Sequence, residues 1–169
     1  VYEALAYKPG DLYDVNGVKG VVLYVDETGT SGLIMSMDQA YLQWSTEYAW
    51  VNCVTNRGDW HTEDMLKLGA DKYPAAKWCA DHGEGWYFPS SREMHLMWDA
   101  VSNGTHEWDK DYVKLYNDKL DDPISEDYYW SSNETSENMA EVIAFMGNSV
   151  ICLDPIKDKS FYVRAVHKF

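Results

Sequence analysis

The chain has 169 residues, about the length of one ordinary domain, and its 46% apolar and 15% aromatic content is enough for a packed core, which excludes wholesale disorder. Its 28 acidic residues against 14 Lys and Arg give a formal charge of -14, which disfavours nucleic acid, anionic lipid and heparin-like polymers as partners. No apolar run approaches the roughly 20 residues that cross a bilayer, so we expect a single domain over residues 1–169 that does not span a membrane.

The first forty residues have the pattern of β-hairpins. Asn16-Gly17 is a strong two-residue hairpin signal, because both central positions of a type I′ turn need positive φ. It predicts a hairpin between a strand at residues 11–15 and the apolar run at residues 18–25. A turn at residues 26–31 then returns the chain through residues 33–37.

Helical signals follow an aromatic but aperiodic segment over residues 44–60, which we predict to be loop. Thr62 is a predicted N-cap, with acidic residues in the first turn. Pro74 is suited to the first position of a second helix that runs to Gly83.

A stronger helix signal begins at Ser90, which forms a predicted capping box with Glu93. The apolar residues that follow have helical spacing and indicate an amphipathic helix that ends near Gly104. The residues of this apolar face are Met94, Met97, Trp98 and Val101. The same spacing recurs more weakly from Trp108 to Tyr116.

The last forty residues return to strand patterns. Residues 128–130 open one strand, and Gly147-Asn148 is a second hairpin signal between residues 140–146 and 149–154. Residues 161–169 alternate as a half-buried strand does. The order of strands, helices and strands predicts an α+β fold, with two to three helices on small antiparallel sheets and with N- and C-terminal strands that meet.

The three cysteines, Cys53, Cys79 and Cys152, are an odd number without CxxC spacing, which excludes zinc-ribbon and thioredoxin motifs. One disulfide with one free thiol, or three buried thiols, both fit this count. The chain starts at Val1 without a leader, so we interpret it as a mature or trimmed chain from which a targeting segment, if there was one, is absent, and the lack of a leader says nothing about export.

Four segments together resemble a known family: residues 73–79, 85–94, 129–132 and 162–166. They are similar to the AA-x-x-C helix, the GW-x-x-P-S-x-x-E helix start, the YWSS strand and the terminal V-R-x-V strand of the DUF1566 group. That group is related to the C-terminal domain of a Legionella collagen-like adhesin and to Fibrobacter paralogous domains. The resemblance covers residues 10–169.

The resemblance implies a C-type-lectin-like fold in which long loops carry recognition. It also implies an exported bacterial protein at the cell surface or in the periplasm, such as an adhesin or a lipoprotein of Bacteroidetes, with a lipid anchor on the upstream segment as one option. Many members have a Cys in the terminal strand that can pair with the helix Cys, but this chain has Ala165 there. A disulfide of Cys79 would therefore need Cys53 or Cys152.

Enzyme motifs are absent from the sequence: it has no G-x-S-x-G, no H-E-x-x-H and no P-loop. Cys79 and His82 have the spacing of a thiolate–imidazole pair on a helix, but a thiol beside Trp78 is more typical of a core. Formylglycine-generating oxidases share the lectin-like fold, but their G-N-V-W-E-W segment does not occur here. We therefore predict no enzymatic activity.

We predict no cofactor. Calcium is an alternative, because an acidic run could supply oxygen ligands. The sugar-binding motifs of calcium-dependent lectins and an EF-hand loop do not occur, so a solvated loop is the simpler interpretation of this run. The run consists of Asn117, Asp118, Asp121, Asp122, Glu126 and Asp127.

Our leading hypothesis is a non-enzymatic surface-binding domain for a neutral glycan or a protein. The alternatives are a structural terminal module of a lipoprotein or pilus without a small ligand and, less favoured, an oxidase-like enzyme. Side chains on the loops after residue 132 could hydrogen-bond sugar hydroxyls. The predicted ligand-binding residues are Asn133, Glu134, Asn138, Asn148, Asp154 and Asp158.

Overall fold

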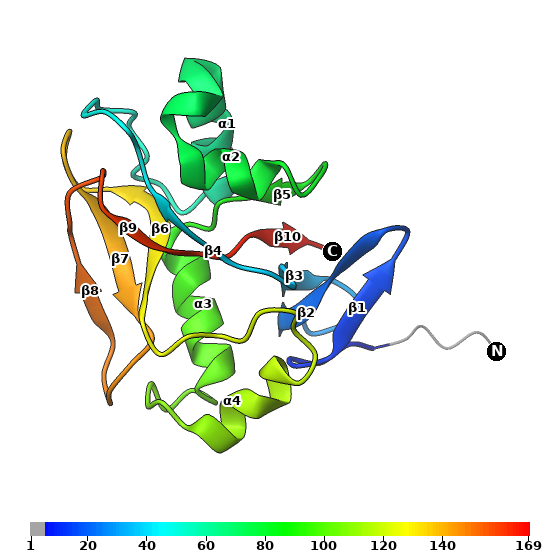
Figure 1. Ribbon diagram of the computed structural model, residues 1–169. Coiled ribbons are helices and arrows are strands. Elements are labelled where there is room, and N and C mark those ends of the chain that lie inside the picture. The colour runs from blue at the N-terminus through cyan, green and yellow to red at the C-terminus, as the bar shows by residue number, and fades with distance from the viewer. Residues whose placement is uncertain (1–5) are drawn as a thin grey trace.

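The computed structural model describes residues 6–169, which contain two five-stranded sheets and four α-helices (Figure 1). Val1, which we interpret as the start of a mature or trimmed chain, lies outside the described residues. The elements are, in chain order, β1 (Leu12–Val15), β2 (Val18–Val25), β3 (Gly32–Met35), β4 (Ala40–Gln43), α1 (Gly58–Gly69), a 3-10 turn η1 (Ala70–Lys72), α2 (Pro74–Ala80), β5 (Trp86–Tyr87), α3 (Ser91–Val101), α4 (Lys110–Asn117), β6 (Tyr128–Glu134), β7 (Ala140–Ala144), β8 (Ile151–Leu153), β9 (Ser160–Val163) and β10 (Val166–Lys168).

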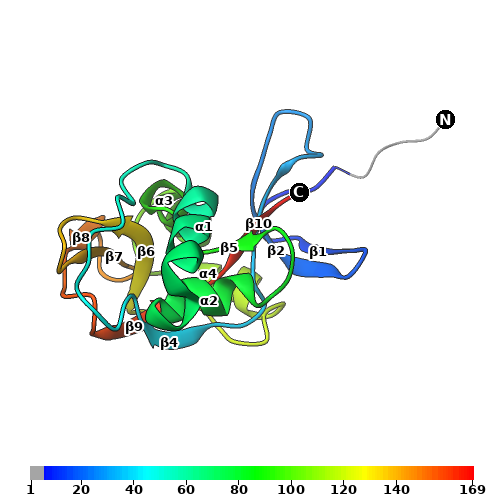
Figure 2. The same ribbon diagram turned by 90° about the horizontal axis from the view of Figure 1, so that it is seen from above.

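The two sheets lie on opposite sides of α3, which contacts β2 in one sheet and β6 and β7 in the other. The first sheet has the strand order β1-β2-β3-β10-β5, and the second has the order β4-β9-β6-β7-β8. Figures 1 and 2 show α1 and α2 together at one end of α3 and α4 at the other. The α+β prediction is confirmed, but the number of α-helices in the described residues is four rather than two to three.

The C-terminal strand completes the sheet that the N-terminal hairpin begins. β10 pairs antiparallel with β3, with Val166 opposite Met35, and the backbone of Phe169 exchanges hydrogen bonds with that of Gly32. The predicted meeting of the terminal strands is therefore confirmed. In the second sheet the pair β6–β9 is parallel and the others are antiparallel.

The local turn signals were correct for the first hairpin and wrong for the second. Asn16 and Gly17 have φ values of 52° and 83° and connect β1 to β2, as a type I′ turn requires. At the second signal, Ala144 pairs with Ile151, so Gly147 and Asn148 lie in a longer connection between β7 and β8.

The best predicted helix is α3. The hydroxyl of Ser90 accepts from the N–H of Glu93, and the Glu93 carboxylate accepts from the N–H of Ser90, which completes the predicted capping box. The helix then buries Met94, Met97, Trp98 and Val101 against both sheets. It ends at Val101, three residues before the predicted Gly104.

Three tryptophans, Trp86, Trp98 and Trp130, are buried in the core. The exposed fraction is 8% for Trp86, 1% for Trp98 and 0% for Trp130. The three cysteines are free thiols, with Cys53 and Cys79 buried and Cys152 exposed. The disulfide alternative is therefore wrong, and the alternative of three buried thiols is wrong for Cys152.

Arg164 stabilises the segment in which the chain passes from the second sheet to the first. It lies between β9 and β10, and the guanidinium donates to the carbonyl of Ser36 (2.8 Å), the side-chain oxygen of Gln39 (2.7 Å) and the carbonyl of Asp122 (2.8 Å). Burial lowers the pKa of Arg164. The V-R-x-V segment therefore joins this crossover to the neighbouring one between β3 and β4.

Candidate functional site

Two of the six predicted ligand-binding residues lie in β6 instead of an exposed loop. The Asn133 side chain accepts from the N–H of Ser91 (2.8 Å) and donates to the carbonyl of Thr55 (3.0 Å). The Glu134 carboxylate is buried and accepts from the Cys53 N–H (2.7 Å). The loop expected over residues 133–138 is therefore wrong for Asn133 and Glu134, because β6 extends through Glu134, and correct for residues 135–138, which connect β6 to β7.

Glu134 is half of a buried ion pair. Its carboxylate lies 2.6 Å from the ammonium of Lys157, and both side chains are 0% exposed. Lys157 also donates to the carbonyl of Ala49 (2.9 Å) and lies over the ring of Trp44. These contacts fix the segment between β4 and α1 onto the second sheet, which is a structural role.

The other four predicted residues are exposed but lie at two ends of the second sheet. Asn138 and Asp158 are close together, because the carbonyl of Asn138 accepts from the N–H of Lys157 (2.8 Å). Asn148 is in the connection between β7 and β8, directly after Gly147, whose carbonyl accepts from the backbone N–H of Trp108 (3.0 Å). Asp154 follows β8. The structure does not bring the six residues into one site.

The Cys79–His82 pair is not a thiolate–imidazole pair. Cys79 is fully buried, and burial raises the pKa of its thiol well above the usual value. The His82 ring instead lies between the carbonyl of Trp78 (2.8 Å) and the carboxylate of Asp38 (2.7 Å). Both ring nitrogens face acceptors, so this arrangement suits the doubly protonated imidazolium.

We expect His82 to make the stability of the protein pH-dependent. Burial lowers the pKa of His82, but the Asp38 carboxylate and the backbone carbonyls of Trp78 and Cys79 together outweigh burial, so the pKa is raised. A raised pKa contributes stability that is fully present below the unfolded value of about 6.5 and is lost as pH rises through the folded value. Urea unfolding measures the free energy of unfolding of the wild-type protein and of His82→Gln at each pH. The wild-type value should exceed the variant's by about 0.5–1 kcal/mol more at pH 5.5 than at pH 8.5. Asp38→Asn should remove this difference, and an equal gain at both pH values would contradict the assignment.

A buried serine–histidine contact also has a structural role. The Nδ1 of His61 lies 2.7 Å from the hydroxyl of Ser132, and its Nε2 accepts from the backbone N–H of Thr55 (3.2 Å). Nδ1 therefore carries the proton and donates to Ser132, which is the wrong direction for activating a nucleophile. Ser132 is 0% exposed, so a substrate cannot reach it.

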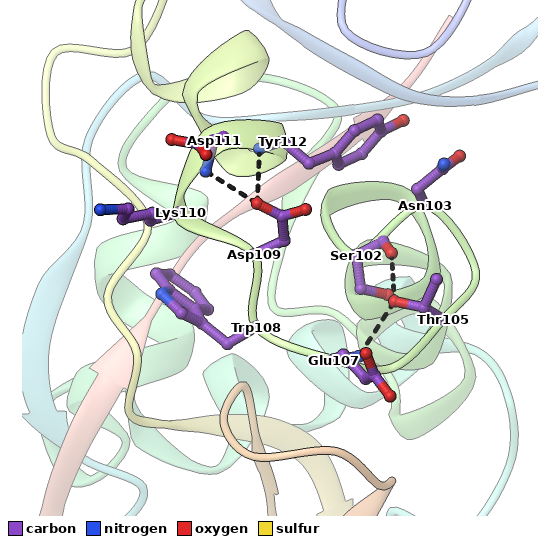
Figure 3. A pocket seen from close by; sticks show the side chains of 9 residues that line it. All are labelled: Ser102, Asn103, Thr105, Glu107, Trp108, Asp109, Lys110, Asp111 and Tyr112. Carbon is purple, nitrogen blue, oxygen red and sulfur yellow. Dashed lines mark hydrogen bonds between the residues drawn. The ribbon is translucent and has the colours of Figure 1, made fainter.

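A polar cavity of about 370 Å³ lies in the connection between α3 and α4, and we call it the α3–α4 hollow (Figure 3). This volume is within the range of small-molecule sites, about 300–1,000 Å³. Its lining residues are Ser102, Asn103, Thr105, Glu107, Trp108, Asp109, Lys110, Asp111 and Tyr112.

Turn and capping residues give the α3–α4 hollow its shape. Asn103 and His106 have positive φ (56° and 55°), which reverses the chain sharply after α3. The hydroxyl of Ser102 donates to the Trp98 carbonyl (2.6 Å) and accepts from the N–H of His106 (3.2 Å). Asp109 then caps α4, because its carboxylate accepts from the N–H of Asp111 (2.9 Å).

Trp108 is the aromatic wall of the hollow. It is half-buried and packs against the core beside α3. Its backbone N–H donates to the carbonyl of Gly147 (3.0 Å). This bond places the β7–β8 connection, with Asn148, beside the hollow. Figure 3 shows the Trp108 ring on one side of the cavity, Asn103 on the other and Asp109 between them.

The hollow is chemically suited to an uncharged polyhydroxylated ligand. The carboxylates of Glu107, Asp109 and Asp111 outnumber the single ammonium of Lys110, so an anion would be repelled. The carboxylates accept hydrogen bonds from hydroxyls, the Asn103 amide both accepts and donates them, and an aromatic ring packs against an apolar sugar face.

The acidic run considered for calcium is used in local hydrogen bonds. The Asn117 side chain accepts from the N–H of Ile124 (2.8 Å), and Asp122 accepts from the N–H of Gln39 (3.0 Å). Asp118 pairs with Lys114 on the surface of α4. Across the described residues, no group of three or more His, Cys, Asp or Glu is arranged to hold a metal ion.

The α3–α4 hollow was not predicted as a site. Trp108 and Tyr112 were predicted only as part of a weak helical repeat. The available signal was the polar segment from Glu107 to Asp111 around one tryptophan, directly before a helix.

The fold is similar to that of a fimbrial protein from Bacteroides ovatus ATCC 8483, with a TM-score of 0.58 and 17% sequence identity. The match covers 82% of this chain and 36% of that chain, so the chain spans about a third of the fimbrial protein's length. At this identity the likeness is one of fold. No family model matches the chain, and no curated protein matches it. None of the helices over residues 6–169 has the length and apolar character needed to cross a membrane.

Proposed function

We propose that this chain is a domain of an exported bacterial surface protein that binds a neutral glycan in the α3–α4 hollow, without catalysis. The observation that carries the proposal is Trp108, a half-buried tryptophan in a cavity that amide, carboxylate and hydroxyl groups, one ammonium and the Tyr112 ring also line. Such a ring gives the apolar face of a sugar a contact surface, and the polar groups around it match the hydroxyls.

The local charge supports a neutral ligand in particular. Three carboxylates and one ammonium line the hollow, and the whole chain carries a formal charge of -14. Sulfated and phosphorylated glycans would be repelled both at the site and at long range.

The C-type-lectin-like architecture and the relation to the DUF1566 group belong to this proposal. The motif residues of that resemblance have fold-determining roles: Pro74 begins α2, Ser90 caps α3 and Arg164 joins the two sheets. The fold likeness to a fimbrial protein fits a surface-exposed setting.

A second candidate is a structural domain of a surface fibre without a small ligand, and the fold likeness to a fimbrial protein favours it. The two candidates differ in whether the isolated domain binds a glycan. A glycan array therefore separates them, because a structural domain should bind none.

We expect the purified domain to bind neutral oligosaccharides on an array and to ignore sulfated ones. Trp108→Ala should weaken binding of the neutral hits about tenfold, because an aromatic contact contributes up to about 1.5 kcal/mol and 1.4 kcal/mol corresponds to tenfold in affinity. Titration calorimetry with the strongest hit measures this change.

The matched control is Trp60→Ala. Trp60 is an exposed tryptophan on α1, stacked by Arg57 and outside the hollow. Its removal should leave binding unchanged. Binding that survives Trp108→Ala but is lost with Trp60→Ala would move the site to α1, and an array without hits would favour the structural candidate.

A further inference from the structure

The outer edge of β8 is open and apolar. β8 is the last strand of its sheet, at the margin of the molecule in Figures 1 and 2, and within residues 6–169 only β7 pairs with it. Ile151 and Leu153 are 38% and 47% exposed, and Val150 before them is 40% exposed. Natural edge strands are usually kept very short or blocked by Lys, Pro or a bulge, and β8 has only three residues. Between Val150 and Leu153 the sequence has neither Lys nor Pro.

An exposed thiol lies at the centre of this strand. Cys152 is the middle residue of β8, and its sulfur is 3.6 Å from Nε2 of His95 on α3. The other ring nitrogen of His95, Nδ1, lies 2.7 Å from the carbonyl of Ser91 and must donate to it. Nε2 therefore has a free lone pair directed at the thiol. A nucleophile, a base and a group that orients the base are the arrangement of an activated thiol.

We propose that β8 pairs antiparallel with β8 of a second copy of this chain about a twofold axis through Cys152, and that the two Cys152 side chains form a disulfide. An axis through the middle residue places Cys152 opposite Cys152 and Ile151 opposite Leu153. Residues directly opposite in an antiparallel pair have Cα atoms about 4.5–5.5 Å apart, which lies within the 4.4–6.8 Å of disulfides. Opposite side chains also lie on the same face, so each thiol keeps its own His95.

The charges at this edge permit the pairing. Asp154 is an acidic residue just beyond β8, and in the proposed register it lies opposite Val150 of the second copy. Its symmetry mate is four residues away along the strand, about 13 Å at the rise of a β-strand. Repulsion over this distance is screened at physiological ionic strength, where the Debye length is about 8 Å.

The chemistry is thiol–disulfide exchange with a low-molecular-weight disulfide such as oxidised glutathione. His95 takes the proton of Cys152, and the thiolate attacks one sulfur of oxidised glutathione, which breaks that disulfide and releases one glutathione that takes up the proton. Cys152 of the second copy then attacks the mixed disulfide at the protein sulfur and releases the second glutathione. Two protein thiols are oxidised to one disulfide, and one small disulfide is reduced to two thiols.

Burial and the carboxylates of Glu141 and Asp154 raise the pKa of the Cys152 thiol. The thiol is therefore protonated at neutral pH, and exchange depends on a base. His95→Gln should slow the reaction of Cys152 with oxidised glutathione about tenfold or more at pH 7, within the contribution usual for general bases. The mass spectrum of the intact protein follows this rate.

The direct test is incubation of the protein with oxidised glutathione, followed by non-reducing electrophoresis and mass spectrometry of the products. We expect a covalent dimer that dithiothreitol reverses, and none with Cys152→Ser. The double variant Cys152→Ser/Thr135→Cys carries an exposed thiol in the β6–β7 connection instead, and it should give glutathione adducts but little dimer.

The edge is tested separately from the thiol. Ile151→Lys should reduce the rate of dimer formation at least about tenfold and leave glutathione adduct formation unchanged, because a lysine blocks strand pairing but not access to the sulfur. A wild-type protein that forms only the monomeric adduct would overturn the proposal. Dimer formation at the wild-type rate by Ile151→Lys would overturn it too, because the disulfide would then form by chance collision.

Discussion

Replacing Lys157 by methionine is expected to lower the free energy of unfolding by about 3–5 kcal/mol, the usual cost of removing one partner from a buried ion pair. The ammonium of Lys157 neutralises a fully buried carboxylate, that of Glu134, at 2.6 Å. Without it the carboxylate keeps its bonds to the N–H groups of Val51 and Cys53 but has no countercharge. Urea unfolding at pH 7 measures the change.

The double variant Glu134→Gln/Lys157→Met should be less destabilised than Lys157→Met alone, because no buried charge is left unpaired. The surface pair of Lys67 with Glu63 is the control: its atoms are 2.9 Å apart, but the side chains are 69% and 62% exposed. Lys67→Met should change stability by less than about 1 kcal/mol. Equal effects of Lys157→Met and Lys67→Met would show that the buried pair does not hold the segment before α1 in place.

Trp130→Ala is expected to cost about 3–5 kcal/mol, the range for removing a large buried aromatic side chain. Trp130 is 0% exposed, packs edge-to-face on Phe161 at 5.0 Å, and donates from its indole to the carbonyl of Leu42 (3.0 Å). It therefore connects β6 to β4 across β9 in the second sheet. Thermal and urea unfolding with coincident transitions measure the loss.

Phenylalanine variants separate packing from hydrogen bonding. Trp130→Phe removes the donor that satisfies the Leu42 carbonyl, whereas the indole N–H of Trp98 has no partner among the described residues. Trp98→Phe should therefore cost less than Trp130→Phe, by about 1 kcal/mol, because it also removes an unsatisfied buried donor. The opposite order would contradict this account of the two sites.

The elements with purely local signals were predictable from the sequence. The Asn16-Gly17 turn and the Ser90–Glu93 capping box depend on residues at most three positions apart, and both are present. The start of α1 was not predictable. Thr62 was the expected N-cap, but the helix begins four residues earlier at Gly58, whose N–H donates to the carboxylate of Glu93 (3.3 Å). A Cβ on Gly58 would lie 2.5 Å from the carbonyl oxygen of Phe88, so a tertiary contact fixes this end.

The candidate site was hidden for the same reason. Glu134 is of a residue type typical of exposed loops, and its burial depends on the ion pair with Lys157, which lies 23 positions away in the sequence. Trp108 has the spacing of a core helix residue. Its place between α3 and the β7–β8 connection depends on a contact distant in sequence, the hydrogen bond from its backbone N–H to the carbonyl of Gly147. The polar residue types therefore indicated which segments are exposed, but they did not indicate where the surface forms a cavity.

The most direct test of the central claim, that the α3–α4 hollow is the glycan site, is a ¹H–¹⁵N spectrum of the eight tryptophan indole groups during titration with neutral oligosaccharides. We expect the Trp108 signal to shift in a saturable way, together with backbone amides of residues 102–112, while the signal of Trp60 stays in place. Saturable binding that shifts Trp60 or Trp50 and leaves Trp108 unchanged would contradict the assignment.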